Sequence, residues 1–229
     1  MSAMNDWTKI ATILRAQGDK LYMPIERPEF EGWPVIQPCA ERLKIIEGTE
    51  IPFDYTVHRV LDVGCHTGWF SRRCAETKPS WMLTGQRSVI GIDRSLEWIM
   101  VARAMNEGHE NPPEYRLADW TDEACELPEA DMTLALNVLM YAWDGGLEHG
   151  WRAYARLAKT APLLFVELGG QYAVRLPFAA EEAGPILAER GGFETWSLAG
   201  RSALDRPIYC FRRGNAYGSL GAHAAAKST

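Results

Sequence analysis

The chain has 229 residues, of which 47% are hydrophobic and 24% are charged. These are the values of an ordinary globular protein, and they exclude the collagen-like, low-complexity and disordered classes. Lysine and arginine number 24 and aspartate and glutamate 30, so the net charge is −6. That balance disfavours a general nucleic-acid binder, which needs clustered cations.

Five cysteines occur without a CxxC pair and without a histidine cluster at zinc spacing. This predicts reduced thiols and no metal site. The first twenty residues contain charged side chains and lack the apolar segment of a secretory signal, and the most apolar stretch, residues 130–143, is too short to span a bilayer. We therefore expect a cytoplasmic protein with no membrane span.

Short apolar runs alternate along the chain with segments of helical period, which is the pattern of an α/β domain with a mainly parallel sheet. The predicted strands cover residues 57–63, 88–92, 114–117, 130–136, 162–167, 193–198 and 207–212. The predicted helices cover residues 7–17, 38–47, 69–76, 95–106, 148–159 and 179–190. Ser95 is the expected N-cap of the fourth helix.

The connection between the last two predicted strands is short, so we expect them to be antiparallel. Residues 51–213 are thus predicted to form a doubly wound seven-stranded α/β sheet domain, mostly parallel with an antiparallel last strand. Residues 1–50 are predicted to form a helical cap. Residues 214–229 are mostly Gly, Ala and Ser, which predicts a flexible tail.

The strongest motif is VLDVGCHTGWFS at residues 60–71, in which a buried strand carries an acid and is followed by Gly64 and Gly68 at the start of a helix. In an open α/β sheet a ligand binds beyond the carboxyl ends of the strands, and glycine lets the backbone approach it closely. We therefore expect this turn to hold a cofactor. Counted from Gly64, His66 and Trp69 stand where a GxGxxG motif has its later glycines, which argues against NAD or FAD.

Two further predicted strands end in acids. VIGID ends in Asp93, a carboxylate that can accept hydrogen bonds from the two hydroxyls of an adenosine ribose. RLADW ends in Asp119 and Trp120, where the acid can accept from an exocyclic amine and the ring can cover a flat base. The carboxyl edge of the sheet is therefore predicted to bind an adenosine-containing molecule.

With these motifs the sequence resembles the class I S-adenosylmethionine-dependent methyltransferases, which have a Rossmann-like fold. The resemblance implies that the turn at residues 64–68 holds the methionine part of the cofactor, that Asp93 holds the ribose, and that Asp119 and Trp120 lie along the adenine. His66 stands where the family most often has glycine. We expect it to avoid a positive φ angle, because a Cβ atom penalises that region.

A more distant likeness is to the methyltransferase half of the bacterial O-antigen chain-terminating kinase/methyltransferases. It rests on Tyr22, on PEFEG at residues 28–32, on the RL pair that begins at Arg42, and on RPIY at residues 206–209. The likeness implies that Tyr22 and Arg42 close over the methionine end of the cofactor, with Arg42 pairing with its carboxylate. The cofactor contacts implied altogether are Tyr22, Arg42, Asp62, Gly64, Cys65, His66, Gly68, Asp93, Arg94, Ala118, Asp119, Trp120, Leu136 and Asn137.

Some of these residues have a structural alternative. Asp62 can accept hydrogen bonds within the fold, and Cys65 can fill a small buried space. Arg42 can be a solvated helix residue, and Tyr22 a packing aromatic. The sequence leaves these alternatives open.

The predicted function is methyl transfer to oxygen or phosphate of a small molecule or glycan. Transfer from a sulfonium depends largely on orientation, and a base is needed only for a poorly acidic acceptor such as an alcohol. Tyr141, His149 and Glu167 follow strand ends on the side where an acceptor would lie, and they are the candidates for such a base. Asn137 is not followed by the PPY of amino-group methyltransferases of nucleic acids, which argues against base N-methylation.

Two other functions stay open at this point. One is a non-catalytic S-adenosylmethionine-binding module, in which Met140, Trp143 or the N-terminal cover would block the acceptor pocket. The other is an RNA methyltransferase, which would need a basic patch. The arginines that could supply such a patch are Arg72, Arg73, Arg87 and Arg94. The sequence does not reveal the oligomeric state.

Overall fold

The computed structural model describes residues 7–16, 18, 20–37, 39–51, 57–76, 87–170 and 173–214. The predicted flexible tail lies, apart from Gly214, outside these residues. None of the helices in the described parts of the chain is long and apolar enough to cross a membrane.

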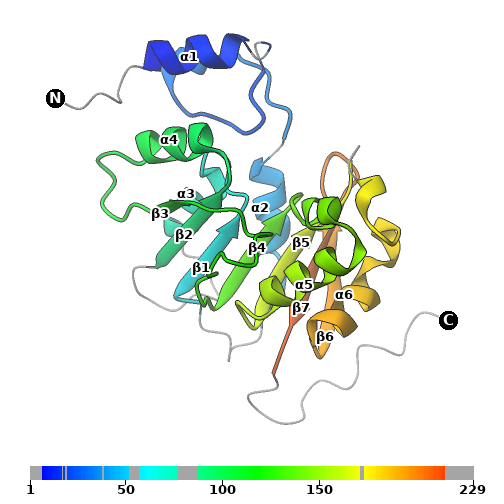
Figure 1. The fold of residues 1–229 in the computed structure, drawn as a ribbon. Coiled ribbons are helices and arrows are strands. Elements are labelled where there is room, and N and C mark those ends of the chain that lie inside the picture. The colour runs from blue at the N-terminus through cyan, green and yellow to red at the C-terminus, as the bar shows by residue number, and fades with distance from the viewer. Residues whose placement is uncertain are drawn as a thin grey trace.

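Seven strands form one sheet in the order β3-β2-β1-β4-β5-β7-β6 (Figure 1). They are β1 (Arg59–Val63), β2 (Ser88–Asp93), β3 (Glu114–Leu117), β4 (Met132–Leu136), β5 (Leu163–Glu167), β6 (Thr195–Arg201) and β7 (Pro207–Arg212). The pairs among the first five strands are parallel, whereas β7 is antiparallel to both β5 and β6. The predicted sheet, with its antiparallel last strand, is confirmed. Because β1, β2 and β4 are neighbours and parallel, their carboxyl ends meet at one edge.

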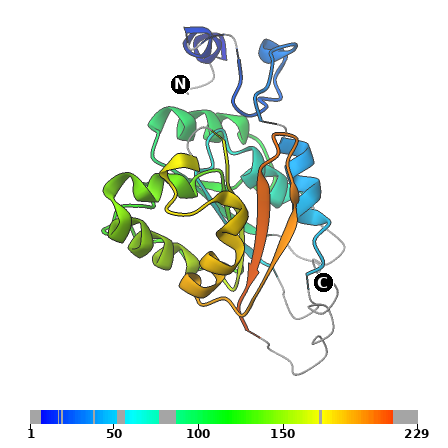
Figure 2. The ribbon, with the colours of Figure 1, turned by 90° about the vertical axis from the view of Figure 1, so that its right-hand side faces the viewer.

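Helices cover both faces of the sheet (Figure 2). The helices in the described residues are α1 (Trp7–Ala16), α2 (Cys39–Glu47), α3 (Trp69–Glu76), α4 (Leu96–Met105), α5 (Leu147–Ala158) and α6 (Ala183–Gly191). Of these, α1 packs against α4 and not on the sheet. Helices α2 and α3 share one buried cluster with the sheet, and α5 and α6 share another. Every residue of β4 and β5 is buried, as expected of central strands covered on both sides.

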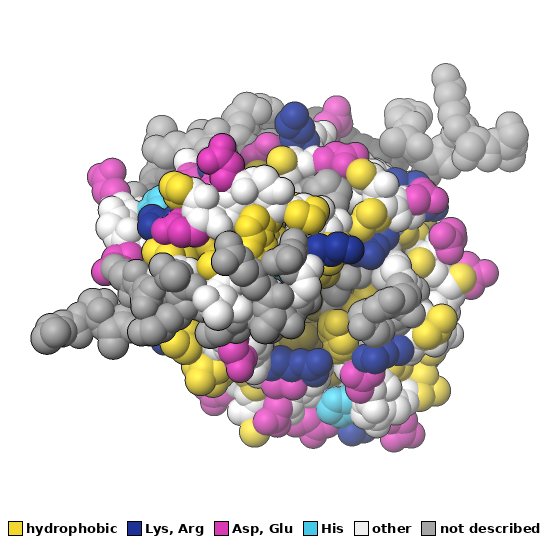
Figure 3. Space-filling model, turned by 90° about the horizontal axis from the view of Figure 1, so that it is seen from above, with side chains coloured by type: hydrophobic (Ala, Val, Ile, Leu, Met, Phe, Trp, Pro, Cys, Tyr) yellow, Lys and Arg dark blue, Asp and Glu magenta, His cyan; other side chains and the backbone are white. Residues whose placement is uncertain are grey.

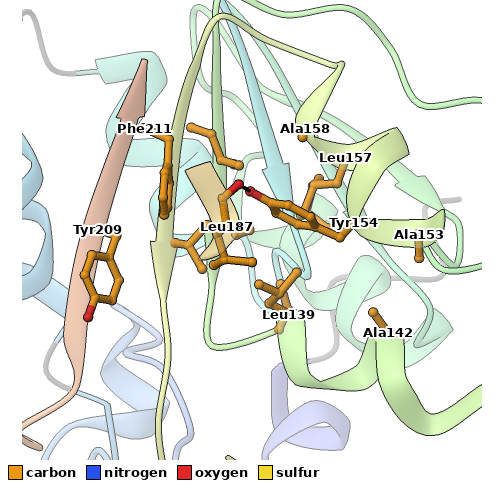
Figure 4. Close-up of a cluster of buried hydrophobic side chains, with 14 of the residues drawn as sticks. Leu139, Ala142, Ala153, Tyr154, Leu157, Ala158, Leu187, Tyr209 and Phe211 are labelled. Carbon is orange, nitrogen blue, oxygen red and sulfur yellow. Dashed lines mark hydrogen bonds between the residues drawn. The ribbon is translucent and has the colours of Figure 1, made fainter. Parts of the chain in front are cut away.

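The cluster under α5 and α6 shows how the second layer is fixed. Tyr154 of α5 is fully buried, and its hydroxyl donates a hydrogen bond of 2.7 Å to the carbonyl oxygen of Leu187 in α6 (Figure 4). Leu157 and Phe211 lie in the same cluster. A buried hydroxyl without a partner would cost about 1–3 kcal/mol, so this bond ties the two helices together as they pack on the sheet.

Local signals set several helix ends, among them the predicted cap at Ser95. The Ser95 hydroxyl accepts a hydrogen bond from the backbone N–H of Trp98 and so caps α4. Gly192 ends α6 in a left-handed conformation with φ of 67°. However, α6 begins at Ala183 rather than at residue 179, after a short 3-10 turn. Pro185 explains the difference, because a proline is tolerated in the first turn of a helix and disrupts its interior.

The N-terminal segment lies against two parts of the domain. Helix α1 and the segment that follows it form a buried cluster with the outer side of α4, in which Trp7, Phe30 and Met105 meet. Helix α2 is buried against the sheet itself. Between these helices, residues 20–37 pass over the carboxyl edge of β1 and β4 (Figure 1), where Tyr22 and Gln37 reach the cavity described next.

Candidate cofactor-binding site

A cavity of about 700 Å³ lies at the carboxyl ends of β1, β2 and β4. This volume is in the range of small-molecule and cofactor sites. Figure 3 shows the molecule from this end, where Lys and Arg side chains and hydrophobic side chains border a hollow. The lining residues are Tyr22, Met23, Ile36, Gln37, Gly64, His66, Asp93, Arg94, Ser95, Trp98, Asp119, Trp120, Leu136, Asn137, Val138, Tyr141, Gly169, Gly170 and Arg206.

The glycine turn after β1 forms one wall. The backbone N–H groups of Gly64 and Cys65 both donate to the carbonyl oxygen of Ile92, at 2.8 and 3.0 Å. Gly64 and Gly68 have φ angles of 69° and 72°, which only glycine adopts without strain. A Cβ atom on Gly68 would lie 2.4 Å from the hydroxyl oxygen of Tyr115, so glycine also permits the close contact of this turn with β3.

His66, in the middle of this turn, has a φ of 52°, so the prediction that it avoids a positive φ was wrong. Three contacts offset the strain of about 1–2 kcal/mol that a Cβ atom brings there. Its backbone N–H donates to Asp93 Oδ2 at 2.9 Å, and its ring stacks on Trp98 with centroids 3.9 Å apart and lies 5.0 Å from the ring of Tyr22. Burial lowers the pKa of His66 to about 3, so its imidazole is neutral at neutral pH.

Asp93 faces the cavity from the end of β2. Its two carboxylate oxygens accept backbone hydrogen bonds of 2.9 Å from His66 and Ser95. Burial raises its pKa and outweighs the lowering by these bonds and by Arg94. Because an ionised carboxylate has about four acceptor positions, Asp93 is held in place by the turn and can still accept from ligand hydroxyls.

The end of β3 supplies the acid and the aromatic that the sequence indicated. Asp119 and Trp120 both line the cavity. Asp119 Oδ1 accepts from the backbone N–H and the hydroxyl of Thr121, at 3.0 and 2.7 Å, which fixes its orientation. Trp120 is 6% exposed. An oriented acid therefore lies beside a rigid aromatic wall, and Leu136 also lines the cavity.

Five of the predicted cofactor residues do not line the cavity. They are Arg42, Asp62, Cys65, Gly68 and Ala118. Gly68 and Cys65 shape the turn from behind, and Ala118 packs at the edge of the core under α5 and α6. These three positions can affect a ligand only through the backbone that they hold.

Asp62 and Arg42 are turned into the interior instead. The Ser71 hydroxyl donates to Asp62 at 2.6 Å, and burial raises the pKa of Asp62 to about 6. The Arg42 guanidinium forms an ion pair of 2.6 Å with Glu167, and both side chains are 0% exposed. The structural alternative for Asp62 therefore matches its contacts, and the predicted pairing of Arg42 with a cofactor carboxylate is opposed by a carboxylate already beside it.

The three candidate bases lie in different surroundings. Tyr141 lines the cavity, and the guanidinium carbon atoms of Arg94 and Arg175 lie 4.9 and 5.5 Å from its ring centroid. Glu167 is buried against Arg42 and does not reach the cavity. His149 lies on α5 beside Gly145, away from the lining residues. The structure thus brings only Tyr141 of the three to the cavity wall.

The sequence reasoning missed several lining residues. Trp98 lies on α4, where it reads as an ordinary core position, and Gly169 and Gly170 follow β5 without a recognised motif. Arg206 begins the RPIY strand, which the sequence comparison noted without assigning a role to the arginine. The sequence did offer one signal, the two consecutive glycines at 169 and 170. In the structure they allow a close approach, because Cβ atoms at these positions would lie 2.8 and 2.7 Å from the Arg206 side chain.

Comparisons with known proteins agree with this geometry. Residues 60–161 match the family model of a methyltransferase domain. The structure of the bifunctional kinase-methyltransferase WbdD has a similar fold, with a TM-score of 0.66 and 24% identity over 88% of this chain and 46% of that one. This chain thus spans about half the length of WbdD. None of the curated protein sequences matches it.

Two other solved structures share the fold. Magnesium protoporphyrin IX methyltransferase (ChlM) from Synechocystis PCC 6803, solved with bound SAM, has a TM-score of 0.54 and 16% identity over 77% of each chain. The N-terminal domain of EvdMO1, solved with SAH, has a TM-score of 0.61 and 14% identity over 93% of this chain and all 100% of that one.

Residues 60–161 thus match a methyltransferase domain, and the seven-stranded sheet has the Rossmann-like fold of these solved methyltransferases. These findings agree with the resemblance that the motifs predicted. The similarity to WbdD confirms the likeness to a kinase/methyltransferase that the sequence motifs predicted.

Proposed function

We propose that the cavity binds S-adenosylmethionine and that the enzyme transfers its methyl group to an oxygen or phosphate of a small molecule or glycan. The observation that carries the proposal is the position of Asp93, which is fixed by two backbone N–H groups and faces the same cavity as the glycine turn. The class match supports the choice of cofactor.

Each part of the cavity has a role in this proposal. The turn at residues 64–68 holds the methionine end, Asp93 accepts from the ribose hydroxyls, and Asp119 and Trp120 hold the adenine. Tyr22 reaches over the turn from the N-terminal segment, where its ring contacts His66. The cofactor supplies an electrophilic methyl group on a cationic sulfur, so the protein contributes mainly by holding the reactants in line.

The non-catalytic alternative would need an obstructed acceptor side. Met140 is fully buried and Trp143 is 8% exposed. Trp143 packs edge-on against Trp151, and neither Met140 nor Trp143 lines the cavity. The N-terminal segment does line the cavity, through residues 22–23 and 36–37, but about 700 Å³ stays free beside it. These observations favour an open acceptor side, and with it an enzyme.

The RNA alternative would need a basic patch, and the four candidate arginines do not form one. Arg72 and Arg73 both pair with Glu26, at 2.7 and 2.5 Å, and Arg87 is buried and donates to a backbone carbonyl. Arg94 instead faces the cavity. The four arginines therefore do not form the exposed cationic surface that a nucleic acid requires.

Calorimetric titration with S-adenosylmethionine and S-adenosylhomocysteine tests cofactor binding. A saturable heat signal is expected, and its absence at millimolar ligand with folded protein would contradict the proposal. A radiolabelled methyl assay over fractionated lysate of the source cell then tests transfer. Label is expected in a small-molecule or glycan fraction, and label in RNA alone would favour the alternative.

A further inference from the structure

The cavity has a second side, formed by the ends of β4 and β5 and the start of β7, where Arg206 is the principal polar group. The Asn137 amide is oriented so that its oxygen faces hydrogen-bond donors and its nitrogen faces an acceptor. The oxygen accepts from Arg206 Nη1 at 3.2 Å and from the Tyr22 hydroxyl at 3.0 Å. The nitrogen donates to the carbonyl oxygen of Gly169 at 3.1 Å. Asn137 thus joins the N-terminal segment to Arg206 and orients the guanidinium.

The chain makes room for this guanidinium. Gly169 and Gly170 have φ angles of 138° and 75°. A Cβ atom on Gly169 would lie 2.8 Å from Arg206 Cγ, and one on Gly170 would lie 2.7 Å from Arg206 Nη2. The arginine therefore lies directly on the backbone that follows β5, at the cavity wall.

Arg206 has charge that the described part of the protein does not neutralise. It is half-buried, its Nε atom is buried without a hydrogen-bond partner, and it forms no ion pair with the acids in the described residues. Arg42 and Arg72, which are also buried, each have a glutamate at 2.7 Å or less, whereas buried Arg87 lies outside the cavity and donates to the backbone carbonyl oxygen of Cys74. A partly buried cation without a counter-ion is costly, which points to a ligand that supplies one.

A second arginine faces the same cavity. Arg94 lies against the ring of Tyr141 at 4.9 Å, and no carboxylate among the described side chains comes within ion-pair distance of it. The two acids in the lining, Asp93 and Asp119, belong to the ends of β2 and β3, where the proposed function places the nucleoside. The lining thus contains two acids for the nucleoside and two arginines in addition.

We infer that Arg206, assisted by Arg94, binds an anionic oxygen group, a carboxylate or a phosphate, on the methyl acceptor. The inference rests on the proposed function and adds the chemical class of the acceptor. An arginine suits this role because its planar guanidinium can donate two parallel hydrogen bonds to such a group. One oxygen of this group forms a bond to the methyl carbon as the sulfur–methyl bond breaks, and S-adenosylhomocysteine is the leaving group. Because that oxygen is already ionised, it has no proton to remove, and no base is required of Tyr141 or Glu167.

Anion titrations of the wild-type protein and three variants test the inference. Inorganic phosphate and acetate are titrated at constant ionic strength, with and without saturating S-adenosylhomocysteine, and the fluorescence of the lining residues Trp98 and Trp120 reports binding. Arg206→Gln should weaken binding of the preferred anion at least tenfold, and Arg206→Lys at least threefold. Arg116→Gln is the matched control, because that exposed arginine pairs with Glu114 outside the cavity.

The outcomes separate the inference from the proposed function. The inference is overturned if the wild-type protein binds neither phosphate nor acetate. It is also overturned if Arg206→Gln binds the preferred anion with the same affinity as the wild type. A tenfold loss of S-adenosylhomocysteine affinity in Arg206→Gln also overturns it, since Arg206 would then hold the cofactor's own carboxylate. If the wild-type protein does not bind S-adenosylhomocysteine, the proposed function fails, while the titrations without it still test the anion site. Arg206→Lys keeps the test valid if Arg206→Gln does not fold.

Discussion

The ion pair between Arg42 and Glu167 gives the sharpest prediction about stability. It joins α2 to the end of β5, both side chains are 0% exposed, and the shortest N–O distance is 2.6 Å. Burial alone would lower the pKa of Arg42, but the charge of Glu167 raises it above the ordinary value, so Arg42 stays charged. Replacing Glu167 by Leu therefore leaves a buried charge without a counter-ion.

The size of the stability loss in Glu167→Leu depends on the contacts that the Arg42 guanidinium keeps. The other contacts are weak: Gln37 Oε1 at 3.4 Å, Cys39 Sγ at 3.6 Å and the ring of Phe70 at 4.8 Å. Removing one partner of a buried pair costs about 3–5 kcal/mol. Set against a typical total of about 5–15 kcal/mol, Glu167→Leu should remove at least about a fifth of the stability.

Urea unfolding followed by circular dichroism measures this loss. The double variant Arg42→Met/Glu167→Leu should recover most of it and unfold within about 2 kcal/mol of the wild type, because an apolar pair can replace a buried ion pair. The exposed pair of Arg116 and Glu114 is the matched control, and its removal should cost less than about 1 kcal/mol.

Two results would refute this reasoning. A loss below about 1 kcal/mol in Glu167→Leu would mean that Arg42 is not held by Glu167. A large drop of S-adenosylhomocysteine affinity in the folded double variant, measured by calorimetry, would mean that Arg42 turns to the cofactor, as the family likeness implied.

Three further predictions concern the glycine turn and the acids. Asp93→Ala should weaken binding of S-adenosylhomocysteine by about 1–3 kcal/mol in a calorimetric titration, because hydroxyl donors lose their acceptor; unchanged affinity would contradict the ribose role. Gly68→Ala should lower the free energy of unfolding in urea more than Gly108→Ala does. Both glycines have a positive φ, but only at position 68 would the new Cβ atom clash, 2.4 Å from the Tyr115 hydroxyl oxygen. Equal losses would mean that this contact is unimportant. Burial raises the pKa of Asp62 to about 6, above the unfolded value, so its contribution to stability is lost as pH rises from about 4 to 6. Asp62→Asn should therefore be less sensitive to pH over that range than the wild type, and equal slopes would show that Asp62 is not protonated in the fold.

The sequence predicted the fold well where local signals are strong. The strand Glu114–Leu117, the strand Pro207–Arg212 and the helix Trp69–Glu76 have the predicted ends. Glycines, strand-length apolar runs and the cap at Ser95 act over a few residues, and these determine where elements begin and end. His66 was misjudged because the rule against positive φ ignores contacts that only the folded turn supplies.

The sequence by itself thus determined the α/β class, the glycine turn and the acids that follow the strands. Only the tertiary structure decided which partner each arginine has. Arg42 pairs with a glutamate 125 residues away, whereas Arg206 faces the cavity beside Asn137. The reason is physical: periodicity reports which face of an element is buried, but the partner of a charged side chain depends on segments brought together by packing and on the cost of removing that charge from water.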